Sequence, residues 1–289
     1  MFSSVYSASL NGINSQLILC EVDISQGLPR CTVVGLPDAA VHEATERVWA
    51  ALKNSGYACP ASRVRINLAP GDIRKEGPRF DLAIALALLA STSNVSYFAE
   101  RLKDWLTLGE LAMDGKLRPV KGVLSALIMA KKSGIKNVLL PAENKYEGAL
   151  IKGLNCFAVT DLQQAWQCIL GEEESLNLAK IDENTVLTNP KLETNSDFAY
   201  VCGQVIAKKA LEICAAGSHH LLMLGSPGSG KTMLARCLPS IMPRLSDKEA
   251  IETAMIRNSV GQGVSALSYC PPFRQPSSNI SLAGLMGSF

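Results

Sequence analysis

The most constraining feature of the sequence is a glycine-rich stretch that leads into a helical pattern. It reads GSPGSGKT and fits the phosphate-binding pattern G-x-x-x-x-G-K-[ST]. Glycines let the backbone N–H groups of such a loop turn inward around phosphate oxygens, and a helix beginning at Lys231 adds its N-terminal dipole. Lys231, the candidate catalytic group, is expected to reach the β- and γ-phosphates of ATP, and the Thr232 hydroxyl is expected to ligate Mg²⁺. The candidate nucleotide-binding residues are Gly225, Ser226, Pro227, Gly228, Ser229, Gly230, Lys231 and Thr232.

The sequence around this loop has the context that a phosphate-binding loop requires. Residues 221–224 (LLML) are apolar throughout and predict a short buried strand just before the glycines. Residues 204–216 have helical spacing, and a further helix is expected from Lys231 until Pro239 ends it. A strand, a glycine-rich turn and a helix in this order predict an α/β domain that binds a nucleotide.

Composition sets the outer limits on what the chain can be. At 289 residues, 47% hydrophobic and 19% charged, it is long enough for roughly two domains of about 150 residues. Its net charge of +2 neither demands nor excludes a nucleic-acid partner. The nine cysteines form no C-x-x-C pair, so reduced thiols are expected and a zinc site is not. The longest apolar run, residues 82–90, is shorter than the roughly 18–20 residues that span a bilayer, and no signal peptide is evident. We therefore expect a soluble, cytoplasmic protein.

An acidic stretch with few apolar residues divides the chain. Residues 171–197 are typical of a linker, which separates a domain at 1–170 from another at 198–289. Strand and helix signals alternate in the first domain and predict helices packed on a sheet. Asp81 stands where a helix N-cap belongs, before a helix so apolar that it should be buried. Strands are expected at residues 21–24, 32–34, 63–68, 105–109 and 137–140, and helices at 41–55, 82–90 and 124–133.

Short motifs on both sides of the linker resemble one family. From near residue 5 to about residue 250, the chain looks like the ComM-like branch of the magnesium-chelatase-like AAA+ ATPases. The resemblance implies a Lon-protease-like (ribosomal S5 domain 2-like) α/β domain, followed by the first part of a P-loop AAA+ domain. It also implies a homo-hexameric ATPase that acts on DNA in branch migration during natural transformation. The motifs are Gly27-Leu28-Pro29, Val34-Gly35-Leu36-Pro37, Asn54-Ser55-Gly56-Tyr57, Asn67-Leu68-Ala69-Pro70, Lys75-Glu76-Gly77-Pro78, Leu108-Gly109-Glu110-Leu111, Ala215-Ala216-Gly217-Ser218-His219 and Met233-Leu234-Ala235-Arg236.

The same resemblance suggests further nucleotide contacts. It implies that Val201, Gly203 and Gln204 lie against the adenine base. The alternative is that these residues only begin a helix and touch no ligand. Tyr200 and Cys202 stand where the family more often carries charged residues, so no role is assigned to them.

The Lon-like domain is not expected to be a peptidase. Lon-type proteases use a serine nucleophile activated by a buried lysine. Here Gly77-Pro78 is followed by Arg79 and not by serine, and the lysine position falls near Leu124. A structural, oligomerising or DNA-facing role is expected instead. The charged loop at residues 72–79 is expected to be solvated, with a subunit or DNA contact as the alternative.

Several parts of a AAA+ motor are missing after the phosphate loop. Such motors need an apolar strand that ends in Asp-Glu, a polar sensor and an arginine finger. No such strand follows Thr232, and Asp247, Glu249 and Glu252 fall on a probable helix. We therefore expect the front part of a longer protein, or a truncated product, that binds ATP–Mg²⁺ and hydrolyses it poorly. The alternatives are a non-catalytic binding or assembly module and a chelatase-type metal-insertion ATPase; the Lon-like domain argues against the latter.

Overall fold

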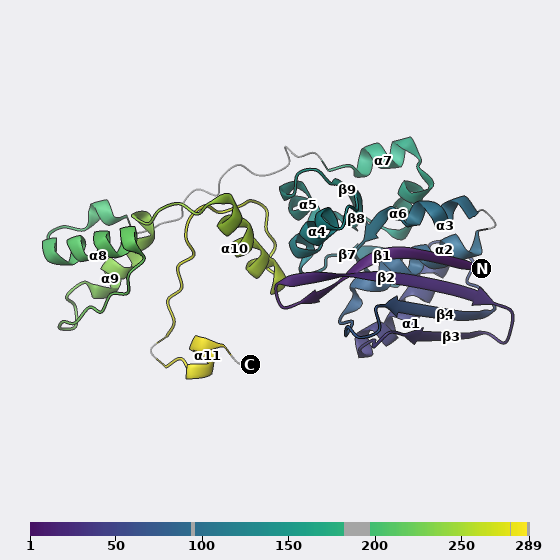
Figure 1. Cartoon of the computed structure of the whole chain (residues 1–289), viewed down its shortest axis with the longest axis horizontal. Coiled ribbons are helices and arrows are strands. Elements are labelled where there is room, and N and C mark those ends of the chain that lie inside the picture. Colours follow the sequence, from purple (N-terminus) through teal and green to yellow (C-terminus); the bar gives the residue numbers. More distant parts are fainter. Residues whose placement is uncertain (94–95, 182–196, 278, 288–289) are drawn as a thin grey trace. The chain divides into compact units, whose positions relative to one another are not determined.

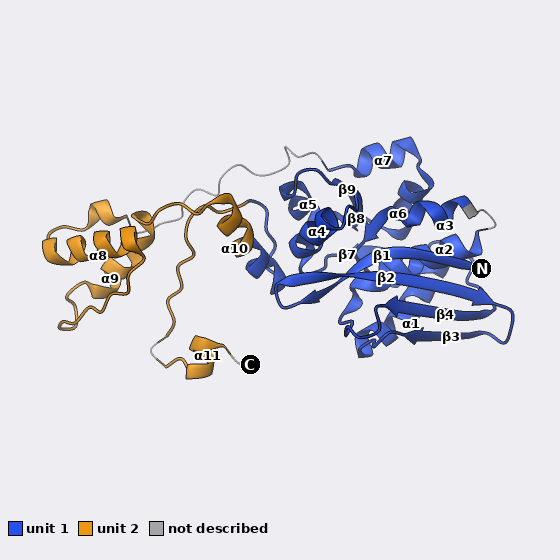
Figure 2. Ribbon diagram, in the orientation of Figure 1, with its two compact units in different colours: residues 1–188, 254–266 blue, residues 189–253, 267–289 orange. Residues whose placement is uncertain are grey.

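The computed structural model describes residues 1–93, 96–181, 197–277 and 279–287. The chain divides into two compact units (Figure 2). The first comprises residues 1–188 and 254–266, and the second comprises residues 189–253 and 267–289. Segment 254–266 therefore belongs to the first unit, although its place after the acidic stretch predicts that it lies in the second domain. The expected boundary also differs, because residues that were expected to be linker pack on the first unit.

One mixed sheet organises the first unit, in the order β3-β4-β2-β1-β5-β8-β9 (Figure 1). Strand β2 runs antiparallel to both of its neighbours, and the other adjacent pairs are parallel. All five expected strands are confirmed. The sheet also contains two strands that were not predicted, at residues 2–11 and 155–159. The strands are β1 (Phe2–Asn11), β2 (Asn14–Ser25), β3 (Arg30–Val34), β4 (Arg63–Ala69), β5 (Trp105–Thr107), β8 (Asn137–Pro141) and β9 (Asn155–Val159), with β6 (Glu110–Leu111) and β7 (Leu117–Arg118) forming a separate pair.

Within the described residues up to 181, seven α-helices accompany this sheet. The three expected helices are confirmed as α1, α2 and α4. Helix α1 ends where Gly56 adopts a φ of +82°, a left-handed conformation that glycine adopts without strain. The helices are α1 (Ala39–Asn54), α2 (Asp81–Thr92), α3 (Ser96–Leu102), α4 (Val123–Lys132), α5 (Lys145–Leu150), α6 (Leu162–Leu170) and α7 (Glu173–Ala179).

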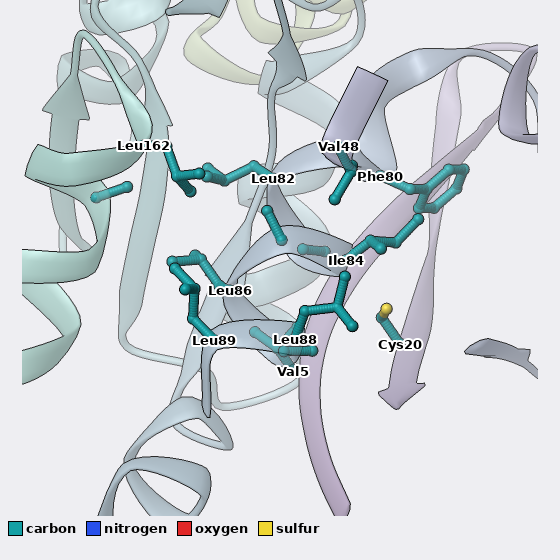
Figure 3. Packing of buried hydrophobic residues seen from close by; sticks show 14 of the residues in the cluster. Val5, Cys20, Val48, Phe80, Leu82, Ile84, Leu86, Leu88, Leu89 and Leu162 are labelled. Atoms are coloured by element: carbon teal, nitrogen blue, oxygen red, sulfur yellow. The ribbon is translucent and has the colours of Figure 1, made fainter. Parts of the chain in front are cut away.

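The core of the first unit gathers around α2 (Figure 3). Every residue from Leu82 to Ala90 is buried, as expected for a helix that is apolar on all sides. Alternate residues of β2 and β4 point into this core, because successive side chains of a strand point to opposite faces of a sheet. Each buried leucine contributes on the order of 2 kcal/mol. The strand residues in this core are Ile18, Cys20, Val22, Val64, Ile66 and Leu68.

Asp81 is not the N-cap that was expected. It is the first residue of α2, and no N–H group of its own helix bonds to its carboxylate. The carboxylate instead accepts hydrogen bonds from the guanidinium of Arg47 on α1 and from the backbone N–H of Leu111. An acidic residue before an apolar helix predicts an N-cap, and this prediction is wrong for Asp81 because the partner of its carboxylate is distant in sequence.

The expected linker is partly folded. Helix α7 lies within it and packs against α6 and β9, and the N–H of Ile181 donates to the carbonyl of Cys156 at 2.9 Å. The Ser175 hydroxyl also donates to the side-chain amide of Gln167 on α6. The rest of the expected linker, residues 182–196, lies outside the described residues.

A buried polar network attaches segment 254–266 to the first unit. Asn258 accepts the N–H of Leu124 at 3.1 Å through its side-chain oxygen and the N–H of Gly122 at 3.1 Å through its carbonyl. Its amide nitrogen donates to Glu147 at 3.1 Å, and Asn144 donates to the same carboxyl at 3.5 Å. Asn258 thus satisfies N–H groups at the start of α4 that have no acceptor within their own helix.

The second unit is small and mainly helical. A cluster of apolar side chains holds α8, α9 and the turn before α8 together. Its helices are α8 (Val205–Gly217), α9 (Lys231–Cys237), the first part of α10 (Asp247–Ser259) and α11 (Leu282–Met286). The members of the cluster are Phe198, Val201, Leu211, Leu234 and Cys237.

The strand expected at residues 221–224 is not formed. These residues have no regular secondary structure, and Leu222 and Leu224 are 80% and 86% exposed. A strand needs a neighbour for its backbone groups, and no strand of the described second unit lies beside this segment. The segment keeps the apolar composition of a buried strand in an exposed position.

The described residues include no helix long and apolar enough to cross a membrane. All nine cysteines are free thiols. Burial raises the pKa of the Cys20 and Cys156 thiols to about 12, so both are neutral and inert at physiological pH.

Candidate nucleotide-binding site

The glycine-rich loop has the backbone that phosphate binding requires. Gly228 and Gly230 adopt φ values of +81° and +85°, a region that costs residues with a side chain about 1–2 kcal/mol. No atom lies within 4 Å of the position that a Cβ on Gly228 would take, so this part of the loop is open to a ligand. The glycines that the sequence pattern singled out are therefore used for their conformation and for the space that they leave.

Helix α9 begins directly after the loop and directs its free N–H groups toward it. The N–H of Leu234 donates to the carbonyl of Gly230 at 2.9 Å, which closes the first helical turn. The N–H groups of Lys231, Thr232 and Met233 consequently lack acceptors within the helix. Together with the helix dipole they make the end of the loop electropositive and suited to phosphate oxygens.

Lys231 folds back across the loop that precedes it. Its ammonium donates to the carbonyls of Gly225 at 2.8 Å and Ser226 at 2.7 Å, and to the Ser229 hydroxyl at 3.2 Å. Among the described residues no carboxylate lies within 4 Å of Lys231 to neutralise it. The loop therefore holds a positive charge at the point where the β- and γ-phosphates are expected.

Thr232 is exposed at the second position of α9, where its hydroxyl can act as a metal ligand. The described residues contain no group of three or more His, Cys, Asp and Glu side chains that could hold a metal by themselves. This donor set fits a Mg²⁺ ion that arrives with a nucleotide, because Mg²⁺ takes most of its ligands from phosphate oxygens and water in such sites.

The three residues that the family resemblance placed against adenine lie in different surroundings. Gln204 is next to the loop, since its side-chain amide donates to the carbonyl of Ser229 at 3.3 Å. Gly203 and Gln204 both have left-handed backbones, with φ values of +68° and +53°, and both are exposed. Val201 is 4% exposed and packs in the core of the second unit, so only its backbone is available to a base.

Two of the three acidic residues after the loop, Glu249 and Asp247, have structural partners. Glu249 accepts hydrogen bonds from the N–H of Ser246 at 2.8 Å and from its hydroxyl at 2.7 Å. These bonds lower the pKa of Glu249 and form a capping box at the start of α10, which the S-x-x-E spacing could have revealed in the sequence. Asp247 raises the pKa of Tyr269 through a side-chain hydrogen bond. Neither carboxylate is a free base for activating water.

The first unit has no serine–lysine dyad at the two positions where the resemblance to Lon-type proteases implies one. Arg79 and Leu124 occupy these positions, and both are buried. The charged loop at residues 72–79 is not solvated throughout, because Lys75 is fully buried and donates to the carbonyl of Pro70. Its backbone pairs with residues 36–38, so the loop is a structural part of the first unit.

A phosphate-binding loop in one unit and a mixed α/β sheet in the other define the class, a P-loop nucleotide-binding protein with an additional α/β domain. Comparisons with known proteins specify this further. Residues 20–144 match the family model described as "Subunit ChlI of Mg-chelatase". Residues 197–289 match the model described as "Magnesium chelatase, subunit ChlI".

Individual relatives agree with these matches. The YifB protein of Escherichia coli is 41% identical over 286 residues, covering 99% of this chain and 55% of the relative. The competence protein ComM of Haemophilus influenzae is 39% identical over 284 residues, covering 98% of this chain and 55% of the relative. A Lon protease of Syntrophomonas wolfei is 29% identical over 134 residues, which is 45% of this chain and 16% of the protease.

The chain belongs to the ComM-like, magnesium-chelatase-like family, and its α/β first unit is Lon-like. It spans about half the length of the curated relatives that it matches. The resemblance stated from the sequence is confirmed at the level of the family. The roles of individual residues in the nucleotide site stay predictions.

Proposed function

We propose that this chain binds ATP with Mg²⁺ through residues 225–232 and forms the nucleotide-binding part of a ComM-type ATPase. The observation that carries the proposal is the position of Lys231. Its unneutralised ammonium lies across a loop with two left-handed glycines, and three free N–H groups follow at the start of α9. This set of groups is complementary to a triphosphate in charge and in hydrogen-bonding capacity.

In this function each group has a distinct task. Backbone N–H groups of the loop and of the first turn of α9 donate to phosphate oxygens. Lys231 leaves the carbonyls that it now contacts and bonds the β- and γ-phosphates, while the Thr232 hydroxyl contributes one ligand to Mg²⁺. Bound Mg²⁺ supplies positive charge that neutralises the phosphates. Gln204, held beside Ser229, lies on the side of the loop where the base is expected.

Binding of a fluorescent ATP analogue in the presence of Mg²⁺ tests the proposal. We expect saturable binding by residues 1–289, and a loss of at least about tenfold in affinity in Lys231→Ala, because a charge-assisted hydrogen bond contributes about 1.5–3 kcal/mol. Lys209→Ala is the matched control, since Lys209 is exposed on α8 and pairs only with Glu212. Equal binding by native protein and Lys231→Ala would exclude the loop as the nucleotide site.

Hydrolysis by residues 1–289 is expected to be slow. Residues 233–289 contain no apolar strand that ends in Asp-Glu, and Glu249 is engaged in the cap at the start of α10. A steady-state phosphate-release assay tests this. Turnover as fast as that of full-length relatives, abolished by Lys231→Ala, would contradict it.

For the whole protein we propose a DNA-acting motor that works as a homo-hexamer in the cytoplasm. Support comes from the similarity to a relative whose name is competence protein ComM, and the nine free thiols fit a reducing compartment. Light scattering with and without an ATP analogue measures the oligomeric state, and strand exchange on a four-way junction measures branch migration. Full-length protein that stays monomeric with the analogue and moves no junction would contradict this proposal.

Two other functions have specific observations in their favour. A non-catalytic binding or assembly module fits the small core of the second unit, and it predicts a folded first unit without ATP binding. Metal insertion into a tetrapyrrole fits the names of both matched families, which refer to magnesium chelatase. It predicts ATP-dependent chelation when partner subunits are added, which a porphyrin fluorescence assay can detect.

A further inference from the structure

One face of the first unit's sheet carries arginines whose side chains are exposed. The pairing register places Arg30 of β3 beside Arg63 of β4, and Arg65 of β4 beside Asp23 of β2. The alternate residues of β4 (Val64, Ile66, Leu68) face the buried core, so the arginines project from the opposite side of the sheet. Arg30, Arg63 and Arg65 are all exposed. Figure 1 shows the strands that carry them side by side, and we call this surface the arginine face.

The arginines on this face lack partners. Within the described ranges, none of the three lies within 4 Å of a carboxylate or donates a side-chain hydrogen bond. Arg30 and Arg63 are direct cross-strand neighbours, a like-charge arrangement that destabilises a sheet. An anion bound between them would remove this repulsion.

Two carboxylates, Glu21 and Asp23, lie on the same face, and within the described residues neither pairs with an arginine. Glu21 accepts a hydrogen bond from Asn67 at 2.6 Å, and Asp23 lies 3.9 Å from the N-terminal ammonium. Neither forms an ion pair with Arg65, although Asp23 is its cross-strand neighbour. The guanidinium groups on this surface therefore remain available to a ligand.

Aromatic side chains lie along the same face. Phe2 of β1 is the cross-strand neighbour of Asp23 and is 57% exposed. Tyr6, four residues further along β1, lies on the same side of the strand because side chains alternate with a period of two. It lines a hollow of about 510 Å³ together with Lys103 and Lys136. The face therefore carries arginines on β3 and β4 and aromatic side chains on β1, with two lysines beside the hollow that Tyr6 lines.

We propose that the arginine face binds single-stranded DNA, with Arg30, Arg63 and Arg65 on phosphates and a base stacked on Phe2. Proteins that bind single strands combine a positively charged surface with aromatic rings, because every base has a face that can stack. Arg63 and Arg65 are about 7 Å apart along their strand, so they reach separate phosphate groups. The inference rests on the DNA-acting part of the proposed function, and it assigns to the Lon-like unit a contact that is independent of nucleotide.

The test is fluorescence anisotropy of a labelled oligothymidylate with residues 1–289, without nucleotide, from about 50 to 200 mM salt. The Arg30→Gln/Arg63→Gln/Arg65→Gln variant should bind at least about tenfold more weakly. The slope of log K against log salt should fall by about 2, as expected for the loss of three phosphate contacts. Phe2→Ala should weaken binding at least about fivefold.

The matched control removes the same charge elsewhere, in Lys53→Gln/Lys116→Gln/Lys145→Gln, where all three lysines are exposed and lie on α1, between β6 and β7, and on α5 rather than on β3 or β4. It should bind the oligonucleotide within about twofold of native protein. Circular dichroism and thermal melting establish that each variant is folded. Equal losses in both triple variants, no loss in the arginine variant, or no binding by native protein would each overturn the inference.

The outcome is separable from that of the nucleotide proposal. If native protein binds the ATP analogue but its DNA binding does not depend on the arginines, the arginine face is wrong and the nucleotide site stands. If DNA binding depends on the arginines and no analogue binds, the nucleotide site is wrong and the arginine face stands. A preference for duplex over the single strand, with Phe2→Ala unchanged, would overturn the assignment to single-stranded DNA.

Discussion

Arg47 Nε lies 2.8 Å from Oδ2 of Asp81, and a second guanidinium nitrogen lies 3.2 Å from Oδ1. The pair joins α1 to the first turn of α2, and the N–H of Leu111 donates to the same carboxylate at 3.2 Å. The Asp81 side chain has no exposed surface, whereas that of Arg47 is 18% exposed. This forked contact is the principal polar link between the two helices around which the core forms.

Removal of Arg47 alone should destabilise the first unit strongly. Arg47→Met leaves the Asp81 carboxylate buried without its cation, and breaking a buried pair in this way costs about 3–5 kcal/mol. Urea denaturation followed by circular dichroism measures the free energy of unfolding. The double variant Arg47→Met/Asp81→Leu is the control and should recover most of the loss, because no buried charge remains. A cost below about 1 kcal/mol for Arg47→Met would show that the pair is unimportant.

The ionisation of Asp81 should make stability depend on pH. Burial raises the pKa of Asp81 from 3.8 to about 6, more than the hydrogen bonds and charge of Arg47 lower it. The folded state therefore holds the proton of the Asp81 carboxyl more tightly than the unfolded state does. The contribution of this protonation to the free energy of unfolding is fully present below pH 3.8 and is lost as the pH rises through about 6. The difference in unfolding free energy between native protein and Asp81→Asn, measured across this range, reports it. A difference that grows in favour of native protein as pH rises would contradict the sign.

The left-handed glycines of the phosphate loop should be needed for nucleotide binding. Gly230→Ala places a side chain at a φ of +85° and strains the loop by about 1–2 kcal/mol, so affinity for the ATP analogue should fall about five- to thirtyfold. Gly263→Ala is the control, since a Cβ there meets no atom within 4 Å and its φ is ordinary. Equilibrium titration by fluorescence compares the two variants, and similar affinities would show that the loop tolerates a side chain.

Relief of the charge repulsion on the arginine face should raise stability while DNA binding falls. Arg30→Gln removes the like-charge neighbour of Arg63 and should stabilise the first unit by about 0.2–1 kcal/mol. Thermal melting in low salt detects this, and the effect should shrink as salt screens the charges. A drop in melting temperature would mean that Arg30 supports the fold, which its exposure and lack of partners argue against.

The attachment of segment 254–266 should contribute to the stability of the first unit. Asn258→Ala removes one hydrogen bond from Glu147 and leaves the N–H of Leu124 without an acceptor, at a cost of about 1–3 kcal/mol. Burial already raises the pKa of Glu147, so loss of this hydrogen bond should raise it further. Ser259→Ala is the control, because that hydroxyl is exposed and bonds only to the carbonyl of Ile256. Native-state hydrogen exchange at Leu124 separates a local from a global effect.

Local patterns predicted the elements whose structure depends on neighbouring residues in sequence. The helices beginning near Val41 and Leu82 follow from apolar residues along the segment, while Gly56 marks the end of the first and Pro239 the end of the helix from Lys231. The phosphate loop is specified in the same way, because its glycines and its lysine act within eight consecutive residues. The family likeness also follows from such short motifs.

The sequence could not reveal contacts between residues that are far apart along the chain. Asp81 has the pattern of an N-cap, yet its partner Arg47 is 34 positions away. Asn258 follows the phosphate loop in sequence but completes the start of α4 in the first unit, 134 positions away from Leu124. Residues 221–224 have the composition of a strand, but a strand forms only where another strand accepts its hydrogen bonds.

The sequence by itself determined the phosphate-binding loop, the alternation of strands and helices and the family, since each depends on the types and spacing of adjacent residues. Only the tertiary structure decided the burial of Asp81 with Arg47, the position of Val201 in a core and the grouping of Arg30, Arg63 and Arg65 on one face. The physical reason is strand pairing and packing, which bring distant residues together and expose or bury their charges. The spacing of residues along the chain does not reveal which distant residues become neighbours in the fold.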